Sequence, residues 1–256
     1  MKQYFDSTRP RVFAHRGLAL EAPENTPLAF AHAITAGADY IETDVWASKD
    51  GSAVIAHDED LTRLIGDSRR VGDISAADLA KIDLGHGQGV ATLAEVLDGF
   101  PESRFNIDIK DPRAIEPTAH AILDAKAIDR VLVTSFSEAR RRAAVDLLPG
   151  VATSASAWPF VRALLANRLH LSPALIRTLQ GVDAVQIPER ALGLSTIAPR
   201  TIARFHRAGV EVHIWTINDP ARMRALFAVG VDGIVTDRAD LGVLEAKAVK
   251  LSDNPL

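Results

Sequence analysis

The sequence predicts an α/β fold, a (β/α)8 TIM barrel with a small insertion after strand 2. Eight short apolar runs alternate with Ala- and Leu-rich segments of helical period, and parallel strands need crossover helices of this kind. The 256 residues, 47% of them hydrophobic, are enough to bury one large core, so we expect a single domain over residues 1–256. A doubly wound open sheet is the alternative arrangement of the same elements.

The expected elements follow from local signals. The strands are predicted at residues 11–15, 39–45, 104–109, 130–134, 151–155, 182–187, 210–215 and 232–236. Helical patterns lie at residues 27–37, 117–127, 199–209 and 220–230, and several have Pro in the first turn and stop at Gly. A stretch rich in Gly, Asp and Arg, about residues 58–90, interrupts the alternation and is interpreted as an insertion over one mouth of the barrel.

Charge and composition exclude several classes of protein. The net charge of −4, from 29 basic and 33 acidic residues, gives no whole-molecule attraction to nucleic acid or to an anionic membrane. No run of 18 apolar residues exists, so we expect no stable membrane anchor. The chain has no cysteine and opens without an apolar signal segment, which favours a cytoplasmic protein.

The second strand presents two acids on one face. It reads YIETDVW from residue 40 to 46, and side chains alternate between the two faces of a strand. Ile41, Thr43 and Val45 share the face that should pack outward against helices. Glu42 and Asp44 therefore point inward, at the carboxyl end where barrels of this kind place their active sites.

The third strand, RFNIDIK, repeats this design. Phe105, Ile107 and Ile109 are expected to face outward, so Asp108 and Lys110 face inward with Asn106.

Three carboxylates would therefore converge from two neighbouring strands. Buried carboxylates repel one another unless they are neutralised, and all-oxygen ligation favours a hard divalent cation, Mg²⁺ or Ca²⁺, over zinc. The alternative is a structural ion-pair network in which these acids pair with Arg16 and Lys110, and one of the three acids could also lie outside the ligand set.

Two histidines follow apolar runs in the same way, His15 in VFAHRG and His57 in AVIAHDED. Histidine titrates closest to neutral pH, and two histidines can divide the roles of acid and base. Arg16 can hold a phosphate or carboxylate oxygen through its fork of donors, and Gly17 allows a sharp turn.

These residues belong to an ordered set of motifs that resembles the glycerophosphodiester phosphodiesterases, metal-dependent enzymes with a TIM-barrel fold. The motifs occur in the family's order and span about residues 12–238. They are AHRG (14–17), PENT (23–26), IETDV (41–45), AHDEDLTR (56–63), TLAEVL (92–97), NIDIK (106–110), VHIWTIN (212–218) and VDGIVTD (231–237).

The resemblance implies a role for each matching residue. His15 and His57 would be the catalytic acid and base, and Arg16 would grip the phosphate. The implied metal ligands are Glu42, Asp44 and Asp108. Lys110 would neutralise charge beside them, and Trp215 would form a wall of the substrate pocket. Glu24 and Asn25 would support the site, and Asn25 is also a candidate for substrate binding.

The implied reaction is metal-dependent hydrolysis of a small-molecule glycerophosphodiester to glycerol 3-phosphate and an alcohol. Asp108 departs from the family, in which glutamate is the common third ligand, and LTRLIG after His57 departs from the usual pattern.

A lysophospholipase D activity and a non-catalytic metabolite-binding barrel are the alternative functions. A metal-dependent amidohydrolase would need a His-x-His pair on the first strand, which AHRG lacks. The sequence is compatible with a homo-oligomer.

Overall fold

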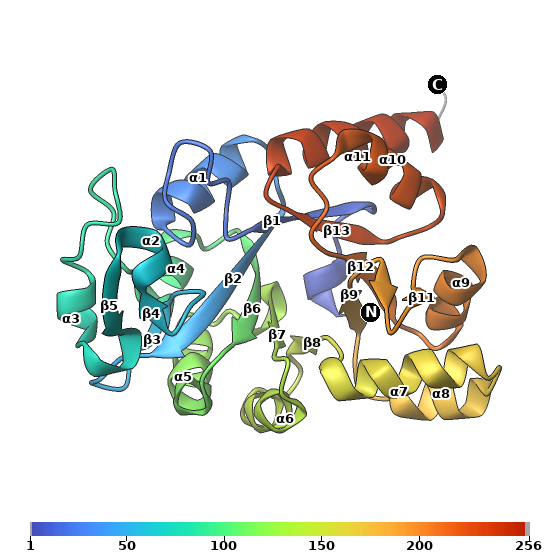
Figure 1. Ribbon diagram of the computed structural model, residues 1–256, viewed down its shortest axis with the longest axis horizontal. Coiled ribbons are helices and arrows are strands. Elements are labelled where there is room, and N and C mark those ends of the chain that lie inside the picture. The colour runs from blue at the N-terminus through green and yellow to red at the C-terminus, as the bar shows by residue number, and fades with distance from the viewer. Residues whose placement is uncertain (1, 254–256) are drawn as a thin grey trace.

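The computed structural model describes residues 2–253 and contains the predicted barrel (Figure 1). Its eight parallel strands are β1 (Arg11–His15), β2 (Tyr40–Ala47), β6 (Arg104–Ile109), β7 (Val131–Thr134), β8 (Ala152–Thr153), β9 (Ala184–Ile187), β12 (Glu211–Ile214) and β13 (Gly233–Thr236). Each lies within two residues of its predicted bounds.

Strand order decides between the two arrangements considered. The sheet runs β8-β7-β6-β2-β1-β13-β12-β9. Its two end strands meet where Ser154 forms a parallel bridge with Ala184, and Asp183 N–H donates to the Thr153 carbonyl at 2.8 Å. An open doubly wound sheet would leave these two strands apart, so the near-closed barrel is confirmed.

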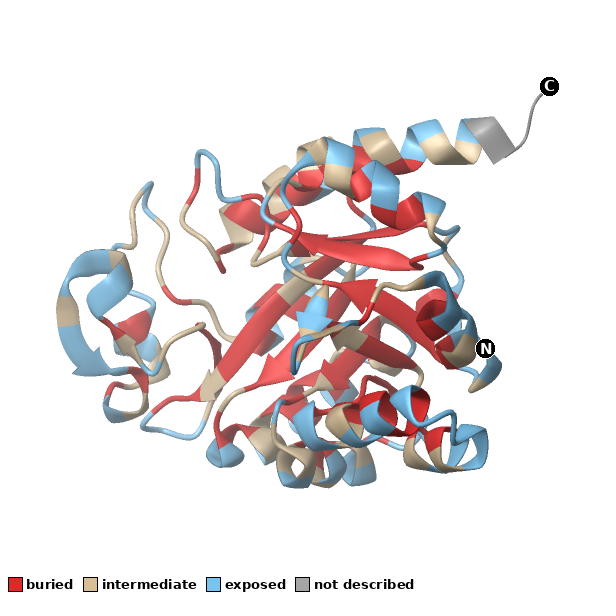
Figure 2. Ribbon diagram, turned by 45° about the vertical axis from the view of Figure 1, so that its right-hand side comes forward, coloured by how far each residue is buried: buried red, intermediate tan, exposed pale blue. Residues whose placement is uncertain are grey.

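Helices surround the strands and turn their apolar faces toward them (Figure 2). They are α1 (Pro27–Thr35), α4 (Leu93–Gly99), α5 (Ile115–Asp124), α6 (Glu138–Leu147), α7 (Ala157–Arg168), α8 (Ser172–Thr178), α9 (Pro199–Arg207), α10 (Pro220–Ala228) and α11 (Ala239–Asp253). Prolines occupy the first positions of α1, α9 and α10, as predicted. Within residues 2–253, no helix is both long enough and apolar enough to cross a membrane.

The insertion after β2 forms a small unit beside the barrel, at the left of Figure 1. β3 (Ala53–Ile55) leads into it and pairs antiparallel with β2 outside the ring of strands. The insertion contains β4 (Asp60–Leu61), α2 (Thr62–Ile65), β5 (Asp67–Arg70) and α3 (Ala76–Leu79). An apolar cluster that includes Val54, Leu61 and Leu79 holds the unit together.

Aromatic side chains close the amino-terminal end of the barrel. Phe13, Tyr40 and Leu132 fill this end together with Tyr4 and Phe5 from the 3-10 helix η1 (Gln3–Phe5). His213, fully buried, packs against the Phe13 ring at a centroid distance of 4.6 Å. The amino-terminal end is therefore filled, and polar side chains gather at the carboxyl ends of the strands.

One shorter pairing and three 3-10 turns complete the fold. β10 (Arg190–Ala191) and β11 (Leu194–Ser195) form an antiparallel pair after β9. The 3-10 turns η2 (Val71–Asp73), η3 (Pro112–Ala114) and η4 (Ile128–Arg130) shape the loops before α3, α5 and β7.

Candidate active site

The carboxyl ends of the strands surround a cavity of about 430 Å³. Its lining includes eight of the nine site residues predicted from the sequence, namely His15, Arg16, Glu42, Asp44, His57, Asp108, Lys110 and Trp215. The ninth, Asn25, does not line it. Parallel strands in register bring these side chains together, because Asp44 on β2 lies directly opposite Asp108 on β6.

The three carboxylates are crowded and poorly hydrated. Asp44 and Asp108 are almost fully buried, and Glu42 is largely buried. Burial, together with the charge of Asp44, raises the pKa of Glu42 to about 8. The same two causes raise the pKa of Asp108. Keeping these carboxylates ionised together is therefore unfavourable, and a bound cation would offset that cost.

Lys110 and Arg16 offset part of the negative charge of these carboxylates. The Lys110 ammonium lies 2.9 Å from Asp44 Oδ1 and 2.6 Å from Asp108 Oδ2. Although burial opposes it, the charges of Asp44 and Asp108 raise the pKa of Lys110. Arg16 Nε lies 3.6 Å from Asp44 Oδ2. The ion pairs of the alternative interpretation are therefore present, but they do not satisfy every carboxylate oxygen of the cluster.

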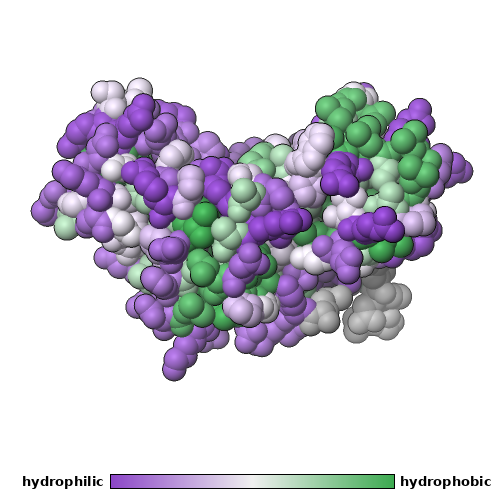
Figure 3. All heavy atoms as spheres, turned by 90° about the horizontal axis from the view of Figure 1, so that it is seen from below, coloured by the Kyte–Doolittle hydropathy of each residue, from purple (hydrophilic) through white to green (hydrophobic). Residues whose placement is uncertain are grey.

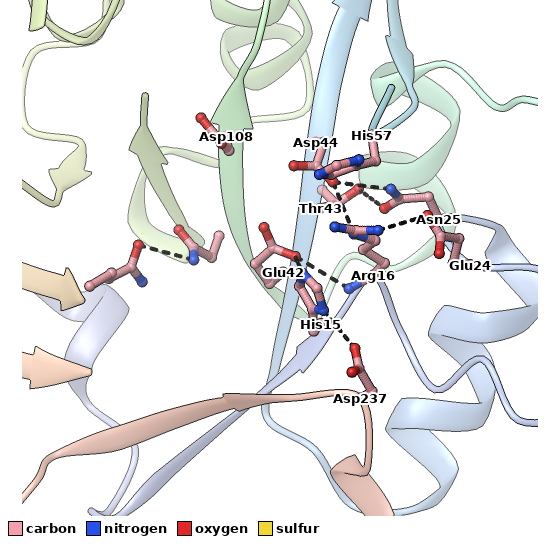
Figure 4. Close-up of polar contacts among 12 residues, drawn as sticks. His15, Arg16, Glu24, Asn25, Glu42, Thr43, Asp44, His57, Asp108 and Asp237 are labelled. Carbon is pink, nitrogen blue, oxygen red and sulfur yellow. Dashed lines mark hydrogen bonds and ion pairs between the residues drawn. The ribbon is translucent and has the colours of Figure 1, made fainter. Parts of the chain in front are cut away.

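Asp108 and Glu42 have carboxylate oxygens that remain available to a cation. Within residues 2–253, no three histidine, aspartate or glutamate side chains lie, as they stand, in an arrangement that could hold a metal ion. However, Asp108 Oδ1 is buried without a hydrogen-bond partner in the described structure, and the Glu42 carboxylate lies toward the cavity, where Figure 4 shows it beside His15. An unpartnered carboxylate oxygen within an all-oxygen donor set fits a hard divalent cation.

His15 is held in place by a residue that the sequence analysis missed. Its Nδ1 lies 2.6 Å from Asp237 Oδ1, and its Nε2 lies 3.9 Å from Glu42 Oε2 (Figure 4). Although burial opposes it, the hydrogen bond to Asp237 and the charge of Glu42 raise the pKa of His15. Asp237 is fixed in turn by Asn218, whose side-chain amide donates to Asp237 Oδ2 at 2.7 Å.

His57 reaches the same cavity from the loop after β3. Its Nδ1 lies 2.7 Å from Asp58 Oδ1, and the Trp46 indole N–H donates to the His57 carbonyl at 3.1 Å. Arg63 binds both Asp58 and Glu24, which ties the insertion to the loop after β1. In the described structure the insertion, residues 58–90, contributes no side chain to the cavity lining. It supports the site from the side and does not lie over the mouth as expected.

Arg16 has a backbone conformation that few residues other than glycine adopt. Its φ of 57° is left-handed, and its backbone is held because its N–H donates to the Glu42 carbonyl at 2.9 Å and its carbonyl accepts from Asn25 N–H at 2.9 Å. Its guanidinium donates to Glu24 Oε1 at 3.0 Å. The guanidinium lies between the two histidines in Figure 4, facing the cavity.

Gly17 completes this turn and gives a test of its geometry. Its φ is +86°, and a Cβ there would lie 2.7 Å from the backbone carbon of Ala29. We expect Gly17→Ala to lower the free energy of unfolding by about 3 kcal/mol, because backbone strain and a main-chain clash add. Gly51→Ala is the matched control, since Gly51 has a φ of +81° with nothing within 4 Å. Equal destabilisation of the two variants in urea titrations would contradict the clash.

Asn25 supports the site from behind the cavity wall. It is 3% exposed, its amide donates to Asp44 Oδ2 at 3.2 Å, and its carbonyl oxygen accepts from the Thr43 hydroxyl at 2.8 Å. The predicted bracing role agrees with these contacts. In the described structure the side chain is buried against Thr43 and Asp44 and does not line the cavity, so the predicted contact of Asn25 with the substrate stays a prediction.

One wall of the cavity is apolar. Trp215 meets Phe136 edge to face, with ring centroids 6.4 Å apart, and Phe160 and Val161 of α7 continue the wall. Sequence analysis identified Trp215 alone, because the other three lie in loops and helices whose orientation depends on the folded barrel. Charged side chains thus occupy one side of the cavity and apolar side chains the other.

Comparison with known proteins identifies the family to which the chain belongs. The sequence profile of the glycerophosphoryl diester phosphodiesterase family matches residues 15–241. A Mycobacterium tuberculosis (strain ATCC 25618 / H37Rv) protein named probable glycerophosphodiester phosphodiesterase 2 is 44% identical over 90% of this chain and 88% of its own.

Solved structures have the same fold. Glycerophosphodiester phosphodiesterase from Thermotoga maritima superposes with a TM-score of 0.74 at 27% identity, over 93% of this chain and 99% of its own. A phosphodiesterase from Oleispira antarctica, solved in complex with its product sn-glycerol 3-phosphate, superposes with a TM-score of 0.76 at 23% identity, over 92% of this chain and 96% of its own. The chain belongs to the glycerophosphoryl diester phosphodiesterase family of enzymes.

Proposed function

We propose that this protein hydrolyses glycerophosphodiesters, such as glycerophosphocholine or glycerophosphoethanolamine, to glycerol 3-phosphate and an alcohol. The observation that carries the proposal is the convergence of His15, Arg16 and His57 on one cavity beside the buried acids. The names of the relatives and the product bound to the Oleispira antarctica enzyme point to the same chemistry.

We propose that Glu42, Asp44 and Asp108 hold a divalent cation, Mg²⁺ or Ca²⁺. Their support is the chemistry of the donor set and the unpartnered Asp108 Oδ1. When bound, the cation would offset the negative charge that builds up on the phosphate oxygens in the transition state. Lys110, already in contact with Asp44 and Asp108, would limit the net charge of the occupied site.

The chain's own residues divide the remaining work. Arg16, anchored by Glu24, presents donors to a phosphate oxygen. One of the two histidines removes a proton from the nucleophile, which is either the neighbouring glycerol hydroxyl or water, and the other protonates the departing alcohol oxygen. Attack by water gives glycerol 3-phosphate directly, whereas attack by the glycerol hydroxyl gives a cyclic glycerophosphate that a water molecule must then open. Trp215 and the apolar wall exclude water from one side of the substrate.

Asp237 orients His15, and its replacement tests that role. We expect Asp237→Asn to lower kcat about 10²-fold with little change in KM, because the imidazole loses its fixed orientation while the binding groups stay in place. Asp240→Asn is the control, since Asp240 pairs with Arg238 outside the cavity. Steady-state kinetics that show equal kcat for Asp237→Asn and the wild type would contradict the positioning role.

The proposed activity is tested by following glycerol 3-phosphate with a coupled dehydrogenase while the purified protein acts on glycerophosphocholine. Steady release with Mg²⁺ or Ca²⁺ supports the proposal.

A second candidate function is favoured by the apolar wall. A lysophospholipase D reaction applies the same chemistry to a longer lipid, whose chain could lie along Phe136, Phe160 and Val161. Release of choline from lysophosphatidylcholine, with no release of glycerol 3-phosphate from glycerophosphocholine, would select this second function.

A further inference from the structure

Large apolar side chains gather on the outer surface of α7 and α8. Trp158 and Leu169 are 64% and 65% exposed, and three more residues of this stretch are also exposed, namely Leu165, Leu171 and Ile176. Folded proteins rarely expose contiguous apolar surface of this kind unless it binds something. In Figure 3, apolar side chains gather on the side of the molecule where α7 and α8 lie, across a hollow from the hydrophilic side that carries the insertion.

The spacing of these residues defines a second face on α7. Residues 158, 162, 165 and 169 recur at intervals of four, three and four, which places them on one side of a helix. The opposite side of α7 is already used, because Phe160, Ala163 and Leu164 pack into the barrel core. The exposed face is therefore not needed to hold α7 on the barrel.

The charge of this region differs from that of the whole chain. Residues 147–182 contain three of the chain's 29 basic residues and none of its 33 acidic residues. The three, Arg162, Arg168 and Arg177, are all exposed. The neighbouring helix α6 carries two acids, of which Glu138 is engaged by Arg141 and Arg142, and Asp146 is exposed near the end of the helix.

The exposed face continues into the cavity wall. Ala157, Phe160 and Val161 of α7 line the cavity, and Trp158 stands next to Ala157 in the same helical turn. Phe136, at the cavity edge, is itself 60% exposed.

We propose that the α7–α8 face, formed by Trp158, Arg162, Leu165, Arg168, Leu169, Leu171, Ile176 and Arg177, docks reversibly on a lipid surface that carries anionic headgroups. Its tryptophan and aliphatic side chains would enter the interface, and its arginines would lie among the headgroups. A second copy of the chain is a poorer partner, because two such faces would bring six arginines together. Docking needs no cleavage, so it holds or fails independently of the proposed function.

The test is sedimentation of the full chain with vesicles of phosphatidylcholine alone and with vesicles containing 30% phosphatidylglycerol, at low and high salt. We expect binding to the anionic vesicles, at least tenfold weaker binding to the neutral ones, and loss of binding at high salt. Leu169→Glu should weaken binding to the anionic vesicles at least tenfold. Leu244→Glu, at a leucine of α11 that is 62% exposed, is the matched control and should bind like the wild type.

Three outcomes would overturn the proposal. They are no binding of the wild type to the anionic vesicles, equal weakening by Leu169→Glu and Leu244→Glu, or a dimer of the wild type in size-exclusion chromatography that Leu169→Glu dissociates. Circular dichroism verifies that both variants are folded. If Leu169→Glu fails to fold, Arg162→Gln combined with Arg177→Gln replaces it, with the same tenfold loss expected.

Discussion

The His15→Ala and His57→Ala variants are each expected to release glycerol 3-phosphate from glycerophosphocholine about 10²- to 10⁴-fold more slowly than the wild type. Each imidazole lines the cavity and is oriented through Nδ1 by a carboxylate, Asp237 for His15 and Asp58 for His57. Alanine removes the proton-transferring atom and leaves the barrel core intact, so we expect the thermal midpoint to change little.

His86→Ala serves as the control for these two variants. His86 lies in the insertion and does not line the cavity, so its loss should leave the rate at the wild-type value. Wild-type rates in either His15→Ala or His57→Ala would remove that histidine from the mechanism. A loss of rate that is accompanied by unfolding would be resolved with His57→Gln, which keeps the size of the side chain.

Removal of divalent cations is expected to have an effect at least as large. After chelation and desalting, we expect release of glycerol 3-phosphate to fall at least 10³-fold and to return with Mg²⁺ or Ca²⁺, because Lys110 and Arg16 satisfy only part of the charge on the acidic cluster. Titration calorimetry gives a second readout that does not depend on turnover. The His57→Ala variant should bind the restoring cation at a single site.

Substitution of Asp108 distinguishes the proposed cation site from a structural ion-pair network. We expect Asp108→Asn to raise the cation concentration for half-maximal activity at least tenfold, and Asp108→Glu to retain binding, since glutamate supplies the same carboxylate donor on a longer side chain. Full activity of the chelated wild type, or unchanged cation binding by Asp108→Asn, would favour the purely structural network.

The sequence predicted the barrel and the inward acids well, for physical reasons. Parallel strands are buried on both faces, so β2 and β6 appear as apolar runs of defined length, and the period of two within each run assigns Glu42, Asp44 and Asp108 to the barrel interior. Pro and Gly marked the helix ends because their backbone preferences are local.

The sequence did not predict contacts between residues that come together only when the barrel closes. Asp237 meets His15 because β13 pairs with β1, more than 200 residues away in the chain. Asn25 was expected near the mouth, but its side chain is buried in contact with Asp44 and does not line the cavity. The insertion was expected over the mouth, whereas β3 pairs with β2 and carries it to the side.

The most direct test of the central claim is to identify which phosphate bond breaks. Phosphorus NMR of glycerophosphocholine incubated with the purified protein and its cation should show the diester signal replaced by that of glycerol 3-phosphate, with free choline in equal amount. A phosphocholine signal with free glycerol would mean that the opposite bond is cleaved. That result, or an unchanged diester signal with either cation, would contradict the proposed reaction.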